Sequence, residues 1–444
     1  MVRLTFSLAA VGAALLSTTA AVDTTVSSGF TASDGSVSFA LNIPQADTSN
    51  DLYFALQADA SQSWVAIGMG SQKMDDSLMW MIYKDKTGKN LTLSPRLSYG
   101  HVEPSYTSNI SVAILPGTGI SNGNYTLNAM CTNCRSWKGG LIDHTNTKAD
   151  FIFASGPSGD LNTNDLSAGI KRHSSYGVFQ MDLTKAYGVA GVPNIPTADS
   201  AGTTQIQDKT DHDFSPALHG CIMILAFVGL MPLGLLILRI MNSVKWHGAN
   251  QALSAAVALI GTAAGIYAGS MYNRSKNWGS GHQIFGLVII AAMIGQFVLG
   301  YMHHRIYKRT QATTKLAPIH VWLGRVVIPA GIANGFLGFP LALNSKYNWA
   351  LLALVLLVVI VIAPFAFWRW KRNNNKAATA AAAGGGYQGG YQAEPWSSDS
   401  NATSNVNLGA YPGGQQGGYG QPQNHPPLYE NPSGYQSAQG RQFV

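Results

Sequence analysis

Four histidines stand out because each lies near one end of a long apolar run. They are His219, His247, His282 and His320. Each run has about 20 residues or more, enough for a helix to cross a hydrocarbon core of roughly 30 Å. An ionisable side chain at that depth is costly and usually faces the bundle interior, where it serves a function. The sequence therefore predicts a membrane bundle whose interior holds these imidazoles.

The alternating direction of the helices decides which histidines can meet. His219 and His282 begin helices that run one way, whereas His247 and His320 begin helices that run the other way. In an up-and-down bundle the first and third helices, and the second and fourth, face each other diagonally across the core. Two facing imidazoles leave room for one flat macrocycle with its iron coordinated from both sides. This arrangement predicts two bis-histidine heme sites, with satisfied polar histidines as the alternative.

Glycine accompanies every one of these histidines. The glycines concerned are Gly220, Gly248, Gly281, Gly286 and Gly324. A porphyrin needs backbone without a side chain beside its ligand, so the pattern favours heme. Membrane helices are also rich in glycine for packing alone, so the glycines do not decide the matter by themselves.

The contexts of the four histidines resemble the cytochrome b561 family of transmembrane two-heme electron carriers. The matching stretches are His219-Gly220, Trp246-His247-Gly248, Gly281-His282-Gln283 and Ile319-His320-Val321-Trp322-Leu323-Gly324-Arg325. The resemblance implies that the four histidines are the axial ligands of two b hemes. It also implies ascorbate as the electron donor and ferric chelates or monodehydroascorbate as acceptors, which would make the chain a transmembrane oxidoreductase.

Composition divides the chain into five parts. Residues 1–21 have a basic start, an apolar core and small residues before a cleavage site, as in a secretory signal. Residues 22–185 have period-two apolar runs between turn-forming clusters, which predicts an all-β, immunoglobulin-like sandwich. Residues 186–216 read as a flexible linker, residues 217–370 as a bundle of five helices, and residues 371–444 as a disordered tail rich in Gly, Gln and Tyr.

The predicted sandwich has three histidines and a cluster of four methionines. They are His101, His144, His173, Met69, Met74, Met79 and Met81. Methionine with histidine is a common axial pair of heme iron and raises its potential above that of two histidines. A methionine stripe is also an ordinary way to fill a core. Composition alone does not choose between these interpretations.

Three motifs of the sandwich are similar to the cytochrome domain of cellobiose dehydrogenases, within the wider family of DOMON domains that bind heme or sugar. They are Trp64-Val65-Ala66-Ile67-Gly68-Met69-Gly70 followed by Met74, then Cys131-Thr132-Asn133-Cys134-Arg135-Ser136-Trp137, then His173 before Tyr176-Gly177-Val178-Phe179. The resemblance covers most of residues 25–185. It implies a third heme held by Met74 and His173, with Met69 as a competitor for the methionine position.

Cysteines and sequons fit an exported domain. Cys131 and Cys134 are the only pair in this part of the chain, and an oxidising compartment favours a local disulfide over a zinc site. Asn-x-Ser/Thr sequons for glycosylation begin at Asn90, Asn109 and Asn124, and a further one begins at Asn273 in an expected external loop.

Basic residues set the orientation of the bundle. The connections expected outside carry only Arg274, Lys276 and Lys346, whereas Lys and Arg are frequent in those expected inside. The positive-inside rule then predicts an extracellular or lumenal sandwich and a cytoplasmic tail. We expect a multi-pass protein, located in the plasma membrane. The pair His219 and His282 becomes the outer site, and the pair His247 and His320 becomes the inner site.

Arg325 is the permanent charge that lies well inside an apolar run. It is either a snorkelling side chain or a partner for a heme propionate or an acidic donor. The chain has no phosphate-binding glycine loop, dinucleotide fingerprint or nucleophile constellation. Its formal charge of +7 comes largely from inner loops and the tail, so nucleic acid is not an expected partner.

These observations predict electron transfer from a cytoplasmic donor, through two membrane hemes and the sandwich, to an external acceptor such as ferric iron, a radical or a secreted redox enzyme. The alternative is a carbohydrate-binding or recognition module without heme, joined to a membrane reductase or a helical anchor. A homodimer within the lipid is compatible with either function.

Overall fold

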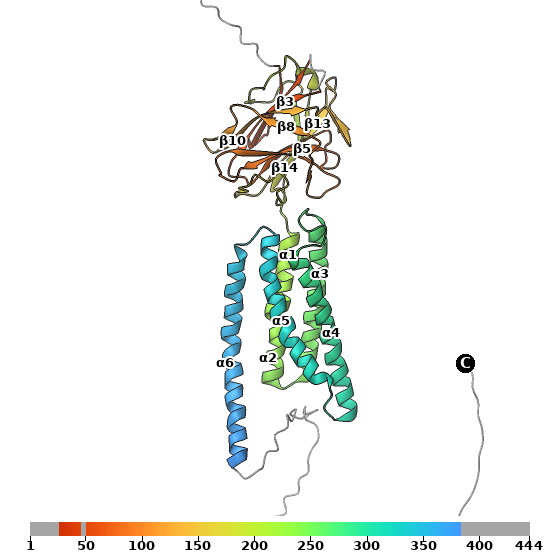
Figure 1. Ribbon diagram of the computed structural model, residues 1–444, viewed down its shortest axis with the longest axis vertical. Coiled ribbons are helices and arrows are strands. Elements are labelled where there is room, and N and C mark those ends of the chain that lie inside the picture. The colour runs from red at the N-terminus through yellow and green to blue at the C-terminus, as the bar shows by residue number, and fades with distance from the viewer. Residues whose placement is uncertain (1–25, 46–49, 383–444) are drawn as a thin grey trace, which may run out of the picture. The chain divides into compact units, whose positions relative to one another are not determined.

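A computed structural model describes residues 26–45 and 50–382, which form a β-sandwich followed by a set of long helices (Figure 1). The predicted signal peptide, residues 1–21, and residues 383–444 of the predicted tail lie outside the described residues. The last helix ends at Ala382 and so continues past residue 370, where the tail was expected to begin. Its end is rich in alanine, the residue with the highest helix propensity.

The sandwich has two largely antiparallel sheets, as the sequence predicted. The first, in the order β1-β2-β3-β10-β8 with β9 on β10 and β15 on β2, contains β1 (Ser28–Thr31), β2 (Val37–Pro44), β3 (Leu52–Asp59), β8 (Ser111–Ile114), β9 (Gly119–Ser121), β10 (Asn124–Thr132) and β15 (Tyr187–Gly188). The second, in the order β16-β14-β13-β4-β5-β6-β7, contains β4 (Val65–Met69), β5 (Leu78–Lys84), β6 (Leu91–Leu97), β7 (Ser105–Tyr106), β13 (Ala149–Ser155), β14 (Ser175–Met181) and β16 (Thr204–Thr210). A small pair, β11 (Ser136–Trp137) with β12 (Gly140–Leu141), and the single turn η1 (Leu183–Lys185) complete this part.

Aromatic stacks between the two sheets hold the sandwich together. Phe54 of β3 lies 3.8 Å from Trp80 of β5, measured between ring centroids, and Phe30 of β1 lies 3.8 Å from Phe179 of β14. All four rings are fully buried, and stacked pairs add attraction beyond the burial of their area. At the end of β10, a disulfide joins the buried residues Cys131 and Cys134.

Residues 186–216, which the sequence predicted as a linker, are largely packed on the sandwich. β15 extends the first sheet beside β2, and β16 extends the second sheet beside β14. β16 was missed because its sequence TQIQDKT contains one apolar residue, and an edge strand exposed to solvent shows no apolar alternation. Only residues 211–214 remain between β16 and the first membrane helix.

Within residues 26–45 and 50–382, five helices are long and apolar enough to cross a membrane. The first combines α1 (Ser215–Ile224), the π-helical turn η2 (Leu225–Leu230) and α2 (Met231–Met241); the others are α3 (Val244–Ser270), α4 (Gly281–Thr310), α5 (Leu316–Leu341) and α6 (Tyr347–Ala382). Each of the first four packs on the next one along the chain, and the first also packs on α5. The first four helices therefore close a ring, which leaves two diagonal pairs, as expected.

Serine caps fix where two of the histidine-bearing helices begin. The hydroxyl of Ser243 accepts a hydrogen bond from the backbone N–H of Trp246, and that of Ser280 accepts one from Gln283. The Gln283 side chain accepts a bond from the Ser280 backbone in return, which completes a capping box. His247 and His282 lie in the first turns that these caps define.

Replacing Phe54 with alanine should cost the sandwich about 3–5 kcal/mol of unfolding free energy, because the loss of its ring empties the core beside Trp80. Ile114→Ala, at an exposed site in the same sheet, is the control and should cost far less. Hydrogen exchange of the β3 and β5 amides in the full-length protein measures both changes. Equal effects of the two substitutions would contradict the assignment of the core.

Candidate functional site

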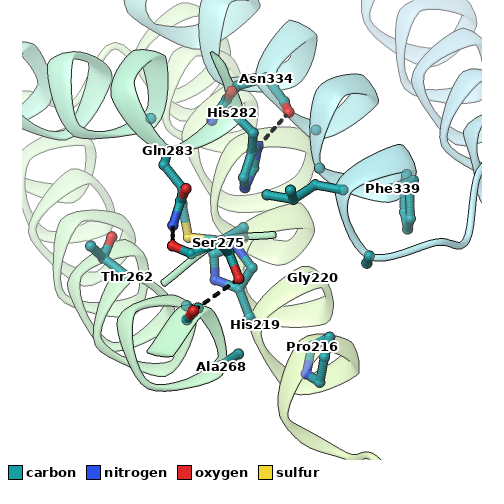
Figure 2. A pocket seen from close by; sticks show the side chains of 18 of the residues that line it. Pro216, His219, Gly220, Thr262, Ala268, Ser275, His282, Gln283, Asn334 and Phe339 are labelled. Atoms are coloured by element: carbon teal, nitrogen blue, oxygen red, sulfur yellow. Dashed lines mark hydrogen bonds between the residues drawn. The ribbon is translucent and has the colours of Figure 1, made fainter. Parts of the chain in front are cut away.

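The outer pair of histidines meets inside the ring of helices. His219, in α1, and His282, in α4, have ring centroids 6.0 Å apart with an angle of 80° between the ring planes. Both line one cavity, which is mostly apolar and is also lined by Phe227, Ile289 and Phe339 (Figure 2). The structure therefore brings together the two residues that the sequence paired.

Each of the four histidines forms a hydrogen bond through Nδ1 with a backbone carbonyl of another helix. The acceptors are Gly261 for His219 at 2.7 Å, Gly234 for His247 at 2.8 Å, Asn334 for His282 at 3.0 Å and Gln296 for His320 at 3.1 Å. A carbonyl can only accept, so Nδ1 carries the proton and Nε2 is left with its lone pair. Histidines that bind metals are oriented in this way by bonds from their second ring nitrogen.

Glycines open three of these carbonyls to the imidazoles. A side chain in a helix covers the turn that precedes it, so the residue four positions after a carbonyl would shield that carbonyl. For Gly261, Gln296 and Asn334 the residue at that position is Gly265, Gly300 or Gly338. A Cβ atom there would lie 2.6, 2.7 or 2.9 Å from a ring atom of His219, His320 or His282, respectively, which is closer than real contacts allow. The fourth carbonyl, which His247 contacts, differs from these three. Its residue is itself a glycine, Gly234, and Leu238 lies four positions later.

The glycines that the sequence singled out are different. Gly220, Gly248 and Gly281 each have open space where a Cβ would be, whereas Gly286 and Gly324 face the side chains of Asn334 and Gln296. The close partners of the histidines lie on other helices, far away in the sequence. In the sequence, each of these glycines follows the residue whose carbonyl accepts the bond by four positions. This spacing does not reveal which histidine is the partner until the helix packing is known.

The inner pair lies at the other ends of the helices. His247 lies at the start of α3 and His320 at the start of α5. Arg325 is exposed on α5, with its guanidinium 4.8 Å from the centre of the Trp322 ring. This outward contact resembles a snorkelling side chain, and the expected contact of Arg325 with a propionate or donor stays a prediction.

The outer pair fits an iron porphyrin better than a bare metal ion. Two bonds of about 2 Å from metal to nitrogen, plus about 1 Å from each nitrogen to its ring centre, give a centroid separation of about 6 Å for imidazoles on opposite sides of one metal. Among the described residues, no three His, Cys, Asp or Glu side chains gather as a metal site. Two imidazoles alone hold a bare ion weakly, whereas a porphyrin supplies four further nitrogens.

In the sandwich, His173 lies just before β14 and is half-buried. Its Nδ1 is 3.4 Å from Oδ2 of Asp211, and its ring centroid is 4.6 Å from that of Tyr176. Burial lowers the pKa of His173, and the nearby carboxylate of Asp211 only partly opposes this change. The imidazole is therefore largely neutral at pH 7, which is the form that coordinates a metal.

The structure separates the two candidate methionines. Met69 is fully buried in the core between the sheets, whereas Met74 is half-buried in the turn between β4 and β5. The side chain of Met69 is therefore enclosed in the core, whereas that of Met74 is partly accessible, and the assignment of Met74 as a heme ligand stays a prediction.

No hydrogen bond or ring contact joins Met74 to His173 in the part of the chain that the structure describes. Met74 follows the end of β4 at Met69, whereas His173 precedes the start of β14 at Ser175. Ser155 of β13 pairs with both Ser175 and Val65, so the start of β14 lies level with the start of β4, not with its end. The two side chains therefore approach the sheet from opposite ends of its strands. Strand alternation gives the outer face between them the side chains of Ala66, Gly68, Ile152 and Ala154.

Two family models match separate parts of the chain. Residues 19–188 match the cytochrome domain of cellobiose dehydrogenase, a range that includes Met74 and His173. Residues 199–305 match a domain of unknown function, DUF2427, a range that includes three of the four membrane histidines. Neither match covers half of the chain, and neither names the cytochrome b561 family. A search of curated proteins found no match.

Two solved structures are similar to the sandwich. One is the cytochrome b domain of pyranose dehydrogenase from Coprinopsis cinerea, with 22% identity and a TM-score of 0.32. The other is the cytochrome domain of cellobiose dehydrogenase from Myriococcum thermophilum, with 15% identity and a TM-score of 0.29. Each comparison covers 37% of this chain and 92% of the other.

Gly300→Ala should displace the His320 ring, because the new methyl group would lie 2.7 Å from it. A cofactor bound through His320 should then be retained about tenfold more weakly, the lower end of effects for residues that orient a metal ligand. Gly295→Ala, on the same helix and facing open space, is the matched control. Cofactor content and the electron paramagnetic resonance spectrum of the purified variants measure the difference, and identical results would refute the positioning role of Gly300.

Proposed function

We propose that this protein transfers electrons across a membrane, from a cytoplasmic donor to an external acceptor. The observation that carries the proposal is the pair His219 and His282, whose rings face each other across an apolar cavity at 6.0 Å. Heme b held at such a site would supply a reversible one-electron iron couple.

The polypeptide contributes position and environment to this function. The backbone carbonyls of Gly261 and Asn334 hold the two outer imidazoles with their Nε2 atoms unprotonated. Apolar side chains exclude water from the cavity, and exclusion of water is a means of setting a potential. His247 and His320 provide an equivalent second site at the opposite ends of the helices.

The sandwich is proposed as a third redox site. Its match to the cytochrome domain of cellobiose dehydrogenase includes both Met74 and His173. Ligation by methionine and histidine raises the potential of iron above that of two histidines, so transfer from the membrane sites to the sandwich would be downhill.

The direction and the partners follow from charge and resemblance. Lys and Arg are concentrated where α2 ends and α3 begins, where α4 ends and α5 begins, and in the last part of α6, which favours a cytoplasmic location for these ends. The cytochrome b561 resemblance supports ascorbate as donor, and ferric chelates or monodehydroascorbate as acceptors. The predicted secretory signal supports export of the sandwich, and the plasma membrane is the proposed location.

The heme content of purified full-length protein tests this assignment. We expect three hemes per chain, one of which disappears in His173→Ala while the two bis-histidine signals persist. His304→Ala, an exposed histidine at the end of α4, is the control and should retain all three. Two hemes in the unaltered protein would favour the alternative of a carbohydrate-binding sandwich on a membrane reductase, and none would refute electron transfer.

Reconstitution in vesicles tests the direction of transfer. With ascorbate trapped on the side of the α4–α5 connection and ferric chelate on the other side, we expect reduction of the chelate. His219→Ala should slow this reduction at least tenfold, because it removes one ligand of the outer site. Reduction at an unchanged rate in that variant would mean that electrons bypass the outer pair.

A further inference from the structure

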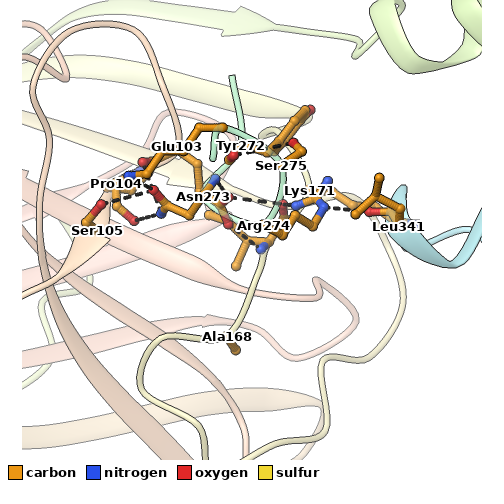
Figure 3. A network of polar contacts seen from close by, with 12 residues as sticks. Glu103, Pro104, Ser105, Ala168, Lys171, Tyr272, Asn273, Arg274, Ser275 and Leu341 are labelled. Atoms are coloured by element: carbon orange, nitrogen blue, oxygen red, sulfur yellow. Dashed lines mark hydrogen bonds and ion pairs between the residues drawn. The ribbon is translucent and has the colours of Figure 1, made fainter. Parts of the chain in front are cut away.

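The loop between α3 and α4 is bonded to two segments of the sandwich (Figure 3). The Glu103 backbone donates to the carbonyl of Met271 at 2.9 Å, and the Ser105 hydroxyl donates to Oδ1 of Asn273 at 3.0 Å. Lys171 also donates to Oδ1 of Asn344, in the connection between α5 and α6, at 2.8 Å. The external connections of the bundle thus contact residues 103–105 and 170–171.

A buried carboxylate and a mostly buried guanidinium lie at the centre of these contacts. The Glu103 side chain is 2% exposed and accepts hydrogen bonds from the backbone N–H groups of Ile170 at 2.6 Å and Asn273 at 2.7 Å. The Arg274 side chain is 17% exposed, lies 3.8 Å from Glu103, and donates to the carbonyls of Ile170 at 2.8 Å and Leu341 at 2.7 Å. Separation of the two parts would leave buried polar groups without partners, which is costly unless water replaces every bond.

The connection between the two parts is short and bonded on both sides. Residues 211–214 separate β16 from α1. Asp211 forms an ion pair with Arg172 of the sandwich at 2.7 Å, and the hydroxyl of Tyr272 in the bundle donates to Asp213. Four residues span at most about 14 Å when fully extended, so the sandwich cannot swing far while β16 stays in its sheet.

The same contacts bring the His173 segment to the outer cavity. Arg274, Tyr272 and Leu341 line that cavity together with His219 and His282. Arg274 donates to the carbonyl of Ile170, and His173 follows three residues later, within about 11 Å along even a fully extended chain. One arginine therefore contacts both the mouth of the outer site and the segment that carries the sandwich histidine.

We propose that Glu103 and Arg274 form a latch that holds the sandwich on the outer mouth of the bundle, and that electrons pass to the sandwich in this docked state rather than after a swinging motion. The functional half of this inference rests on the proposed function. The latch itself is a property of the polypeptide and does not depend on bound heme.

Asn273 has a role in the latch that conflicts with the glycosylation expected there. Its Nδ2 donates to the carbonyls of Glu103 at 3.3 Å and Pro104 at 3.2 Å. A glycan on Nδ2 would replace one of these donors and occupy the place of the sandwich. Asn90 and Asn109, in contrast, are exposed. We expect mass spectrometry to find glycans at Asn90 and Asn109 and none at Asn273; full occupancy of Asn273 would overturn the latch.

Hydrogen exchange on the full-length protein tests the latch without reference to heme. Arg274→Ala should accelerate exchange of the amides in residues 103–106 and 170–174 at least tenfold, because the docked surface opens to water. Lys346→Ala removes an exposed cation from the same side of the bundle and should leave these rates unchanged. Equal rates in Arg274→Ala and the unaltered protein would refute the latch.

An engineered disulfide tests the role of the latch in electron transfer separately from the existence of the latch. Ser105→Cys with Asn273→Cys should form a cross-link, since the replaced side chains are in contact, and should restore slow exchange in the Arg274→Ala background. In the locked protein, reduction of the sandwich heme should proceed at least as fast as in the unlocked one. Loss of that reduction while both membrane hemes remain reducible would show that the sandwich must move, and would overturn transfer in the docked state. Absence of heme would refute the proposed function while the exchange result still decides the latch.

Discussion

The membrane part depends on one repeated interaction, the hydrogen bond from an imidazole Nδ1 to a backbone carbonyl of another helix. A carbonyl within a helix already accepts one bond from its own helix, so a second bond needs an open approach to its remaining lone pair. In three of the four cases a glycine one turn later provides this approach. Helix spacing, ring orientation and tautomer are therefore fixed together, and none can change without the others.

The sandwich follows a different physical logic from the bundle. Its stability comes from a dense aromatic core between two sheets. At its contact with the bundle the interactions are polar instead. The buried ionic groups there, Glu103 and Arg274, contribute specificity of position more than net stability. Arg96, fully buried, is an internal counterpart, because it donates to the carbonyls of Pro104, Leu166 and Ala168 and so braces both segments that reach the bundle.

The sequence was sufficient for features that repeat along the chain, and insufficient for those that depend on packing. Apolar length predicted five helices, and period-two runs predicted the sandwich. The pairing of His219 with His282 followed from helix direction alone. Gly265, Gly300 and Gly338 were missed because their partners are on other helices. β16 was missed because an edge strand needs no apolar pattern. The contact of Glu103 with Arg274 joins residues that lie in different domains and far apart in the sequence.

The position of β16 at the edge of the second sheet has a practical consequence. A soluble fragment that ended at residue 185, the apparent limit of the domain, would lack this strand and expose the backbone of β14 along its length. Unpaired edges of this kind recruit strands from other molecules. A well-behaved fragment must extend to Thr210, and the sandwich is therefore longer by two strands, β15 and β16, than its sequence pattern indicates.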